Sequence, residues 1–309
     1  MLLRKDTILV VGTGAMASLF AARLAASGEK VRMLGTWAES IETLNRSGVR
    51  LIEADGREHE YPVQATDDPN KCVGSRFAII LVKSYQTERV AQQLKVCLAD
   101  DGIALTLQNG LDNDKTLAKS LGIQRVVSGV TTVGATLIEP GIVRDGGTGV
   151  ISIGVNERIQ TLVDILIQAG FEVETVADTD SLVWGKLVIN ASINPLTAIL
   201  NVPNGDLLTN PTARNLMGLI ANEVARVSFE MGVKLPYLDP VLVVESVAQK
   251  TALNISSMLK DVLRGGPTEI DAINGAIVHL GDAVDAPVQY NRTMWLLVKA
   301  MEANAGIRQ

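Results

Sequence analysis

The first half of the chain alternates short apolar runs with helical stretches. Residues 8–11 and 31–34 are strand-sized apolar runs, and a helix is predicted between them at about residues 15–27. The alternation continues through three further apolar runs, at residues 77–82, 103–107 and 126–130. Near-continuous apolar strands separated by helices are typical of a parallel sheet that is covered on both faces. The pattern therefore predicts a doubly wound α/β domain.

From about residue 134 to residue 176 the pattern consists of closely spaced strand candidates broken by glycine. These candidates are residues 141–145, 150–153 and 171–176. We expect them to extend the sheet, partly with antiparallel strands.

Beyond about Asp178 the apolar period becomes helical. Asn210 can cap and Pro211 can open one helix, whose apolar side chains share a face until Gly232 ends it. A second helix is predicted to begin at Thr268. We therefore expect a sheet domain at residues 1–177 and an all-helical domain, carrying substrate and catalytic groups, at residues 178–309.

Composition and charge exclude several classes of function. The 309 residues carry a formal net charge of -6, with acidic and basic residues interspersed, which argues against a nucleic-acid-binding face. Two cysteines and two histidines are too few and too isolated for a disulfide framework or a zinc site, so no metal is expected. The longest apolar runs are shorter than a membrane span, and the N-terminus lacks signal-peptide architecture. These features predict a cytoplasmic protein that binds neither nucleic acid nor membrane.

A glycine-rich loop follows the first predicted strand directly. It reads Gly12, Thr13, Gly14, Ala15, Met16 and Ala17, and it opens the first helix. The first glycine permits a tight turn, the second lets a pyrophosphate approach the backbone, and the helix N-terminus offers unpaired N–H groups. In this position the motif favours a Rossmann-type dinucleotide site over an ordinary tight turn between a strand and a helix.

The end of the second strand bears on the choice of cofactor. An NAD-selective site usually has Asp or Glu there, to bind the ribose 2′-hydroxyl. Here the stretch reads Met33, Leu34, Gly35, Thr36 and Trp37. The missing carboxylate favours NADPH, but no arginine follows the strand to bind a 2′-phosphate, so NADH stays open.

The segment 182–195 combines polar and apolar positions in an informative way. Lys186, Asn190 and Asn194 are spaced at i, i+4 and i+8, so they form one polar stripe on a largely apolar helix. An unpaired buried amide costs about 1 to 3 kcal/mol, so the stripe should face something polar. Two structural alternatives stay open. The stripe can be a solvent face, or Asn194 can cap a new helix that Pro195 opens.

A lysine suits the reduction of a carbonyl group. When hydride reaches the carbonyl carbon, negative charge develops on the oxygen, and a positioned ammonium can stabilise that charge and donate the proton. The two histidines offer no good alternative acid, because His59 is predicted in a charged loop and His279 in a core-type helix.

Taken together, the loop and this helix make the sequence similar to the ketopantoate reductase family. The resemblance covers nearly the whole chain. Its further motifs are residues 82–86 (VKSYQ), 107–110 (LQNG), 186–198, 201–205 (NVPNG), 254–258 (NISSM) and 268–271 (TEID). The resemblance implies reduction of a small 2-keto acid, 2-dehydropantoate, to pantoate with NADPH or NADH, and is compatible with a homodimer.

The resemblance also implies roles for individual residues. Lys186 would be the general acid, and Glu269 would lie beside the reacting centre and orient substrate or cofactor. Lys83 and Asn109 would line the nicotinamide and the reacting carbonyl, and Ala135 would contact the cofactor through its backbone. The hydrogen bonds to the substrate would come from Asn109 and from Asn190, Asn194, Asn204, Asn254 and Ser257.

Each of these assignments has a structural alternative. Asn109 and Asn204 each precede a glycine and can simply form turns. Glu269 follows Thr268, which with Asp271 can form a capping-box-like pair. For the whole protein, the alternatives are another β-hydroxyacid dehydrogenase and a dinucleotide-binding sensor without turnover.

Overall fold

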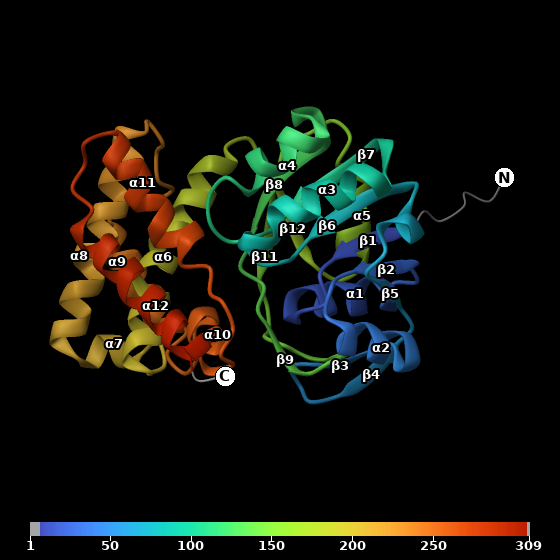
Figure 1. Ribbon diagram of the computed structural model, residues 1–309, viewed down its shortest axis with the longest axis horizontal. Helices are drawn as coiled ribbons and strands as arrows, with labels where there is room; N and C mark the ends of the chain where they lie inside the picture. Colours follow the sequence, from blue (N-terminus) through green and yellow to red (C-terminus); the bar gives the residue numbers. More distant parts are fainter. Residues whose placement is uncertain (1–6, 308–309) are drawn as a thin grey trace. The chain divides into compact units, whose positions relative to one another are not determined.

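The computed structural model describes residues 7–307 (Figure 1). The expectation that the N-terminus is not a signal peptide concerns residues 1–6 in part, and these lie outside the described residues. The chain divides into two compact units. Unit 1 comprises residues 1–108 and 112–179, and unit 2 comprises residues 109–111 and 180–309.

Unit 1 is built on an eight-stranded sheet in the order β12-β11-β8-β7-β6-β1-β2-β5. All pairs of neighbouring strands are parallel except the pair of β8 and β11, which is antiparallel. Its strands are β1 (Ile8–Val11), β2 (Val31–Leu34), β5 (Gln64–Thr66), β6 (Ser75–Ile80), β7 (Leu98–Thr106), β8 (Val126–Thr131), β11 (Val150–Gly154) and β12 (Glu172–Val176). The helical elements are α1 (Ala15–Ala26), α2 (Ala38–Ser47), α3 (Thr87–Cys97), α4 (Asn113–Leu121) and α5 (Gln160–Gln168), with short 3-10 turns η1 (Pro69–Cys72), η2 (Ser84–Gln86) and η3 (Ile123–Arg125).

Alternate residues of β1 enter two different cores. Ile8 and Val10 pack in the cluster that contains residues of α1 and α5, whereas Leu9 and Val11 pack in the cluster that contains residues of α3 and α4. Successive side chains of a strand point to opposite faces, so both faces of the sheet are covered. The predicted doubly wound α/β fold is confirmed.

A second, four-stranded sheet in the order β4-β3-β10-β9 was only partly predicted. It comprises β3 (Val49–Ile52), β4 (Glu58–Tyr61), β9 (Ala135–Glu139) and β10 (Ile142–Asp145). Its strands β3, β9 and β10 contact α1, which therefore lies between the two sheets (Figure 1). The expectation that residues 141–145 extend the main sheet is wrong, because Val143 of β10 packs in the core around α1 and β10 pairs with β3 and β9.

Unit 2 is helical and has its own core. Its elements are α6 (Thr179–Leu200), α7 (Asp206–Thr209), α8 (Pro211–Glu230), α9 (Pro240–Lys250), α10 (Ser257–Leu263), the π-helical turn η4 (Asp271–Gly275), α11 (Ala276–Ala283) and α12 (Gln289–Ile307). Asn210 caps α8 by accepting hydrogen bonds from the backbone N–H groups of Thr212 and Ala213, as predicted. The helix expected from Thr268 begins later, with the π-helical turn at Asp271.

Among the described residues, α6 is the one helix long and apolar enough to cross a membrane by length and composition alone. Its most apolar window is 67% buried inside the protein, as is usual for a core helix. Length and composition are therefore weak evidence for a membrane span here.

Candidate active site

The glycine-rich loop of unit 1 has the geometry that a dinucleotide site requires. Gly12 has φ +128, which is unfavourable for other residues, and a Cβ there would lie 3.2 Å from Cβ of Ala17. Its N–H donates to the carbonyl oxygen of Leu34 over 2.8 Å, which ties the loop to the end of β2. Gly12 is therefore required by both backbone conformation and packing.

Gly14 differs from Gly12, because a Cβ there would meet no protein atom within 4 Å. It occupies the N-cap position of α1, and no side chain caps the helix there. The first N–H groups of a helix have no carbonyl partner within the helix, and they carry the positive end of its dipole. Gly14 is exposed, and an exposed helix N-terminus fits the diphosphate of a dinucleotide, with Thr13, Ala15 and Met16 completing the loop.

The residues after β2 lie beside this loop. A Cβ on Gly35 would come within 2.6 Å of Cγ2 of Thr13, so the chain passes directly against the loop at this point. Thr36 follows, and its Oγ1 accepts a hydrogen bond of 3.3 Å from Nη1 of Arg89, in the first turn of α3. Arg89 lies 53 positions after Thr36, so no pattern at the end of the second strand indicates that it reaches this place.

Two further predicted cofactor residues also belong to unit 1. Lys83 is partly buried and comes shortly after β6, at the start of the turn that leads into α3. Ala135 is partly buried and begins β9, in the small sheet.

The polar stripe of Lys186, Asn190 and Asn194 lies on one continuous helix of unit 2. Lys186 and Asn190 are partly buried, and Asn194 is buried, so the stripe is not a solvent face. The alternative in which Asn194 caps a new helix is wrong, because α6 runs through Pro195 to Leu200 without a break.

The environment of Lys186 changes its acidity. Burial lowers the pKa of Lys186 from 10.5 to about 8, and the negative charge of Glu269 opposes part of that fall. Glu269 is itself 5% exposed, and its Oε2 accepts a hydrogen bond of 3.2 Å from Nδ2 of Asn109. Three residues that are far apart in sequence thus form one cluster in unit 2.

The segment that carries Asn109 is fixed against the segment that carries Glu269. Gly110 has φ +85, and a Cβ there would lie 2.6 Å from the carbonyl oxygen of Ala272. The N–H of Leu111 donates to the same carbonyl oxygen. The chain bends at Asn109 and Gly110, and the amide of Asn109 donates to Glu269.

The capping-box alternative for Glu269 is wrong. The carboxylate of Asp271 accepts hydrogen bonds from Nε1 of Trp295 and Nζ of Lys299. Thr268 Oγ1 donates to Glu302, and the backbone N–H of Ile270 donates to that same hydroxyl oxygen. Glu269 belongs to the cluster with Lys186 and Asn109.

A buried amide supports α6 where proline interrupts its hydrogen bonds. Pro195 has no N–H to donate to the carbonyl oxygen of Ala191, four residues earlier. Nδ2 of Asn274 donates to that oxygen instead, over 3.1 Å, and also to Oδ1 of Asn291. Asn291 in turn donates to the buried carboxylate of Glu223. The network was not predicted; its one signal in the sequence is a proline inside a long helix, which leaves a carbonyl that needs another donor.

The remaining predicted substrate residues lie in a second part of unit 2. Asn204 is 8% exposed and its Nδ2 donates to Oγ1 of Thr251, while its buried Oδ1 has no partner. Its backbone N–H donates to the carbonyl oxygen of Asn254, so these two segments lie together. The side chains of Asn254 and Ser257 are exposed, whereas Ser256 between them is buried and caps α10.

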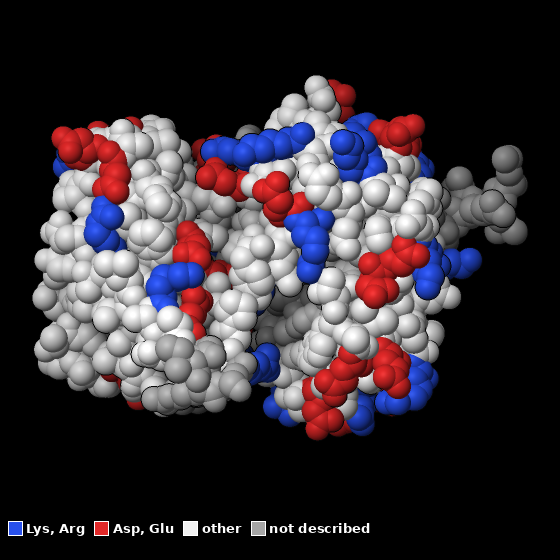
Figure 2. Space-filling view, viewed as in Figure 1, with Lys and Arg blue, Asp and Glu red and all other residues white. Residues whose placement is uncertain are grey.

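Neither histidine is placed to act as the acid. His59 lies exposed in strand β4, not in the predicted loop, and His279 is exposed on α11 with its ring 5.3 Å from that of Trp295. Within residues 7–307 no group of three or more His, Cys, Asp or Glu side chains is arranged to hold a metal ion. On the face shown in Figure 2, acidic and basic side chains are interspersed over each unit.

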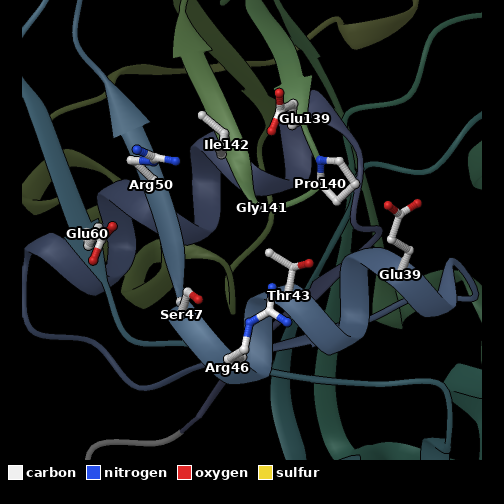
Figure 3. Close-up of a pocket in the computed structure, with 11 residues that line it drawn as sticks. Glu39, Thr43, Arg46, Ser47, Arg50, Glu60, Glu139, Pro140, Gly141 and Ile142 are labelled. Atoms are coloured by element: carbon white, nitrogen blue, oxygen red, sulfur yellow. The ribbon is translucent and has the colours of Figure 1, made fainter.

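One of the surface pockets lies at the small sheet, and no residue of the glycine-rich loop lines it. It has a volume of about 360 Å³ and is bordered by α2, β3, β4, β9 and β10 (Figure 3). Its charged side chains are of both signs: Glu39, Arg46, Arg50, Glu60 and Glu139. This mixture favours no single class of ligand.

Comparisons with known proteins agree along the whole chain. The family model "Ketopantoate reductase PanE/ApbA" matches residues 8–158, and "Ketopantoate reductase PanE/ApbA C terminal" matches residues 178–302. The 2-dehydropantoate 2-reductase of Archaeoglobus fulgidus is 34% identical, with 97% of this chain and 99% of that protein covered. The protein of the same name from Pyrococcus horikoshii is 32% identical, with 97% and 98% covered.

Solved structures show the same similarity. A PanE/ApbA family ketopantoate reductase from Ralstonia eutropha has a TM-score of 0.91 and 32% identity, with 97% of this chain and 99% of that chain covered. A D-mandelate dehydrogenase, solved with NADH and anilino(oxo)acetate, has a TM-score of 0.91 and 26% identity, with the same coverage. The family models cover most of the chain, and the relatives exceed 30% identity over nearly its full length. The chain therefore belongs to the ketopantoate reductase family.

Proposed function

We propose that the protein reduces the 2-keto group of 2-dehydropantoate to the hydroxyl group of pantoate, a step toward pantothenate and coenzyme A, with NADPH as the preferred reductant. Membership of the ketopantoate reductase family and the names of the two archaeal relatives support this substrate. A cytoplasmic location and a homodimer are compatible with the proposal.

The observation that carries the proposal is the setting of Lys186. Reduction of a ketone needs a proton for the carbonyl oxygen, and a good general acid has a pKa near the working pH. A lysine with its pKa lowered to about 8 is mostly protonated at neutral pH, yet it gives up its proton more readily than a lysine in water. Lys186 is therefore assigned as the group that donates a proton from Nζ to the keto oxygen.

Glu269 and Asn109 have supporting roles in this proposal. The negative charge of Glu269 keeps Lys186 protonated to a higher pH than burial alone would allow. The hydrogen bond from Asn109 holds the Glu269 carboxylate in place, and Asn109 is also assigned to the substrate. The amides of Asn190 and Asn194 continue the polar stripe on α6, and Asn204, Asn254 and Ser257 are assigned to the substrate's carboxylate and hydroxyl.

The cofactor is assigned to unit 1. A bound nicotinamide dinucleotide supplies the hydride. The loop from Gly12 to Ala17 would hold its diphosphate, because the N-terminus of α1 lies open above Gly14. Lys83 and Ala135 are assigned to the nicotinamide half, and Thr36 to the adenosine half.

A second candidate substrate class is supported by one observation. The D-mandelate dehydrogenase structure is as similar in fold as the reductase from Ralstonia eutropha, with a TM-score of 0.91 for each. The same fold can therefore serve 2-keto acids with an aryl group in place of the branched, hydroxylated chain, since fold alone does not determine which substrate is bound.

The test is the loss of reduced-nicotinamide absorbance on addition of a keto acid to purified protein. We expect turnover with 2-dehydropantoate, a much lower kcat/KM with phenylglyoxylate, and a kcat lower by about 10² to 10⁴ in Lys186→Ala. A preference for phenylglyoxylate would establish the second candidate. Oxidation of 3-hydroxy acids alone would indicate another β-hydroxyacid dehydrogenase, and cofactor binding without turnover of any acid would indicate a sensor.

A further inference from the structure

Three parallel strands end side by side at the glycine-rich loop. Val11 of β1 is in register with Leu34 of β2 on one side and with Ile80 of β6 on the other. The chain segments that leave these three strands therefore start at the same level. In such sheets the ligand binds at the carboxyl ends of the strands, and the ribose of the adenosine half lies over the end of the second strand.

An arginine reaches this place from the segment that follows β6. Arg89 lies in the first turn of α3, is exposed, and extends to Thr36, the second residue after β2. The guanidinium thus occupies the neighbourhood where an NAD-selective protein would have a carboxylate, although no basic residue follows β2 itself in the sequence.

The contact with Thr36 uses only part of the hydrogen-bonding capacity of the Arg89 guanidinium. Nη1 of Arg89 donates to a neutral hydroxyl oxygen over 3.3 Å, which is long for a hydrogen bond. In the part of the chain that the structure describes, Arg89 forms no ion pair with a carboxylate. Arginine matches the geometry of phosphate with two parallel N–H donors, and the hydroxyl of Thr36 can donate one more hydrogen bond to a phosphate oxygen.

We propose that Arg89, with Thr36 beside it, binds the 2′-phosphate of NADPH and gives the protein its preference for NADPH over NADH. The inference rests on the proposed dinucleotide site of unit 1, but not on the identity of the keto acid. It also explains how a chain without a basic residue after β2 can select a phosphorylated cofactor.

The test measures binding of two small nucleotides by calorimetry, and needs no turnover. Adenosine 2′,5′-bisphosphate carries the 2′-phosphate, and 5′-AMP lacks it but is otherwise identical. For Arg89→Ser we expect about 10- to 100-fold weaker binding of the bisphosphate, the usual effect of losing a hydrogen-bonded charge pair, and unchanged binding of 5′-AMP. Arg89→Lys should recover part of the loss, since it keeps the charge but not the two-donor geometry.

The control is Lys95→Ser, which removes one positive charge from the last turn of the same helix. Lys95→Ser should change the affinity for the bisphosphate and for 5′-AMP by no more than about twofold, because exposed charges at a distance are screened. In the enzyme assay, Arg89→Ser should lower kcat/KM for NADPH and leave that for NADH unchanged.

Three results would overturn the proposal. If Arg89→Ser lost the same affinity for both nucleotides, Arg89 would stack on the adenine. If it lost affinity for neither, Arg89 would not belong to the site. Equal affinity of the wild-type protein for the two nucleotides would show that no 2′-phosphate site exists. If binding follows the expectation but 2-dehydropantoate is not reduced, the substrate assignment fails and the role of Arg89 stands.

Discussion

The glycine-rich loop of unit 1 and the Lys186 cluster of unit 2 are built in opposite ways. In the proposed function the loop binds the cofactor through main-chain N–H groups, and Gly12 and Gly14 contribute no side chains to it. The cluster uses the side chains of Lys186, Glu269 and Asn109, and burial changes the chemistry of the lysine. Binding of a large anion needs many fixed donors, whereas proton transfer needs one group with a suitable pKa.

The two regions also differ in how they are assembled. The loop is local, since six consecutive residues and the strand and helix beside them determine its shape. The cluster combines Lys186 with groups from residues 109 and 269, which are 160 positions apart. Substitutions should therefore separate binding from catalysis, and the following predictions test that separation.

The largest effect should come from Lys186→Met, which keeps most of the side chain's length but removes its proton. We expect kcat to fall by about 10² to 10⁴, the usual contribution of a general acid. The dissociation constant for the reduced cofactor should not change, because the loop is intact. Steady-state kinetics and calorimetry check the two halves of this prediction.

Lys250→Met is a suitable control for the first prediction, because it removes the same charge from the exposed end of α9. It should leave kcat within about twofold of the wild-type value. If Lys186→Met weakened cofactor binding as much as it lowered kcat, the assignment of separate tasks to the two regions would be wrong.

The second prediction concerns pH. In the proposed reaction Lys186 must be protonated, and burial lowers its pKa to about 8, so kcat for reduction should fall about tenfold per pH unit above that value. Because the charge of Glu269 raises the pKa of Lys186, Glu269→Gln should move the fall to lower pH. If kcat of Glu269→Gln fell at the same pH as kcat of the wild-type protein, another group would limit the reaction at high pH.

The local regions are those that the sequence predicted well. The first strand, the loop and α1 follow from an apolar run, two glycines and a helix start, which act over a few residues. The strand Glu58–Tyr61 was missed because it is polar and largely exposed at the edge of the small sheet, so it has no apolar alternation. Membership of β10 in that sheet was missed because pairing partners are set by distant segments.

In the candidate site, too, local features were predicted and contacts between distant segments were not. Spacing alone indicated the polar stripe of α6, and resemblance to a family drew attention to Asn109 and Glu269. No local pattern indicates that Asn109 donates to Glu269, or that Asn274 satisfies the carbonyl left free by Pro195. These contacts depend on tertiary packing, as does the approach of Arg89 to Thr36.

The third prediction separates the two glycines of the loop. In Gly14→Ala the new Cβ meets no protein atom, and φ at this position is −85, so the free energy of unfolding should not change. The same Cβ would enter the space assigned to the diphosphate, so cofactor affinity should fall about tenfold, or 1.4 kcal/mol.

Gly12→Ala is the matched comparison for Gly14→Ala. It forces a residue with a side chain to φ +128 and against Ala17, so it should destabilise the protein by about 1 to 3 kcal/mol. Thermal unfolding without and with cofactor distinguishes the two variants. Unchanged cofactor affinity in Gly14→Ala would mean that the diphosphate does not lie over this residue.

The smallest effects should separate two neighbouring serines of unit 2. Ser257 is exposed and assigned to the substrate, so Ser257→Ala should raise KM for the keto acid about 3- to 10-fold without changing the free energy of unfolding. Ser256 is buried, caps α10 through the N–H of Leu259 and accepts a hydrogen bond from Thr197, so Ser256→Ala should cost about 1 to 2 kcal/mol of stability. Chemical denaturation and initial rates measure both variants. If Ser257→Ala lowered only stability, the segment 254–257 would be a structural support for α10 and not part of the substrate site.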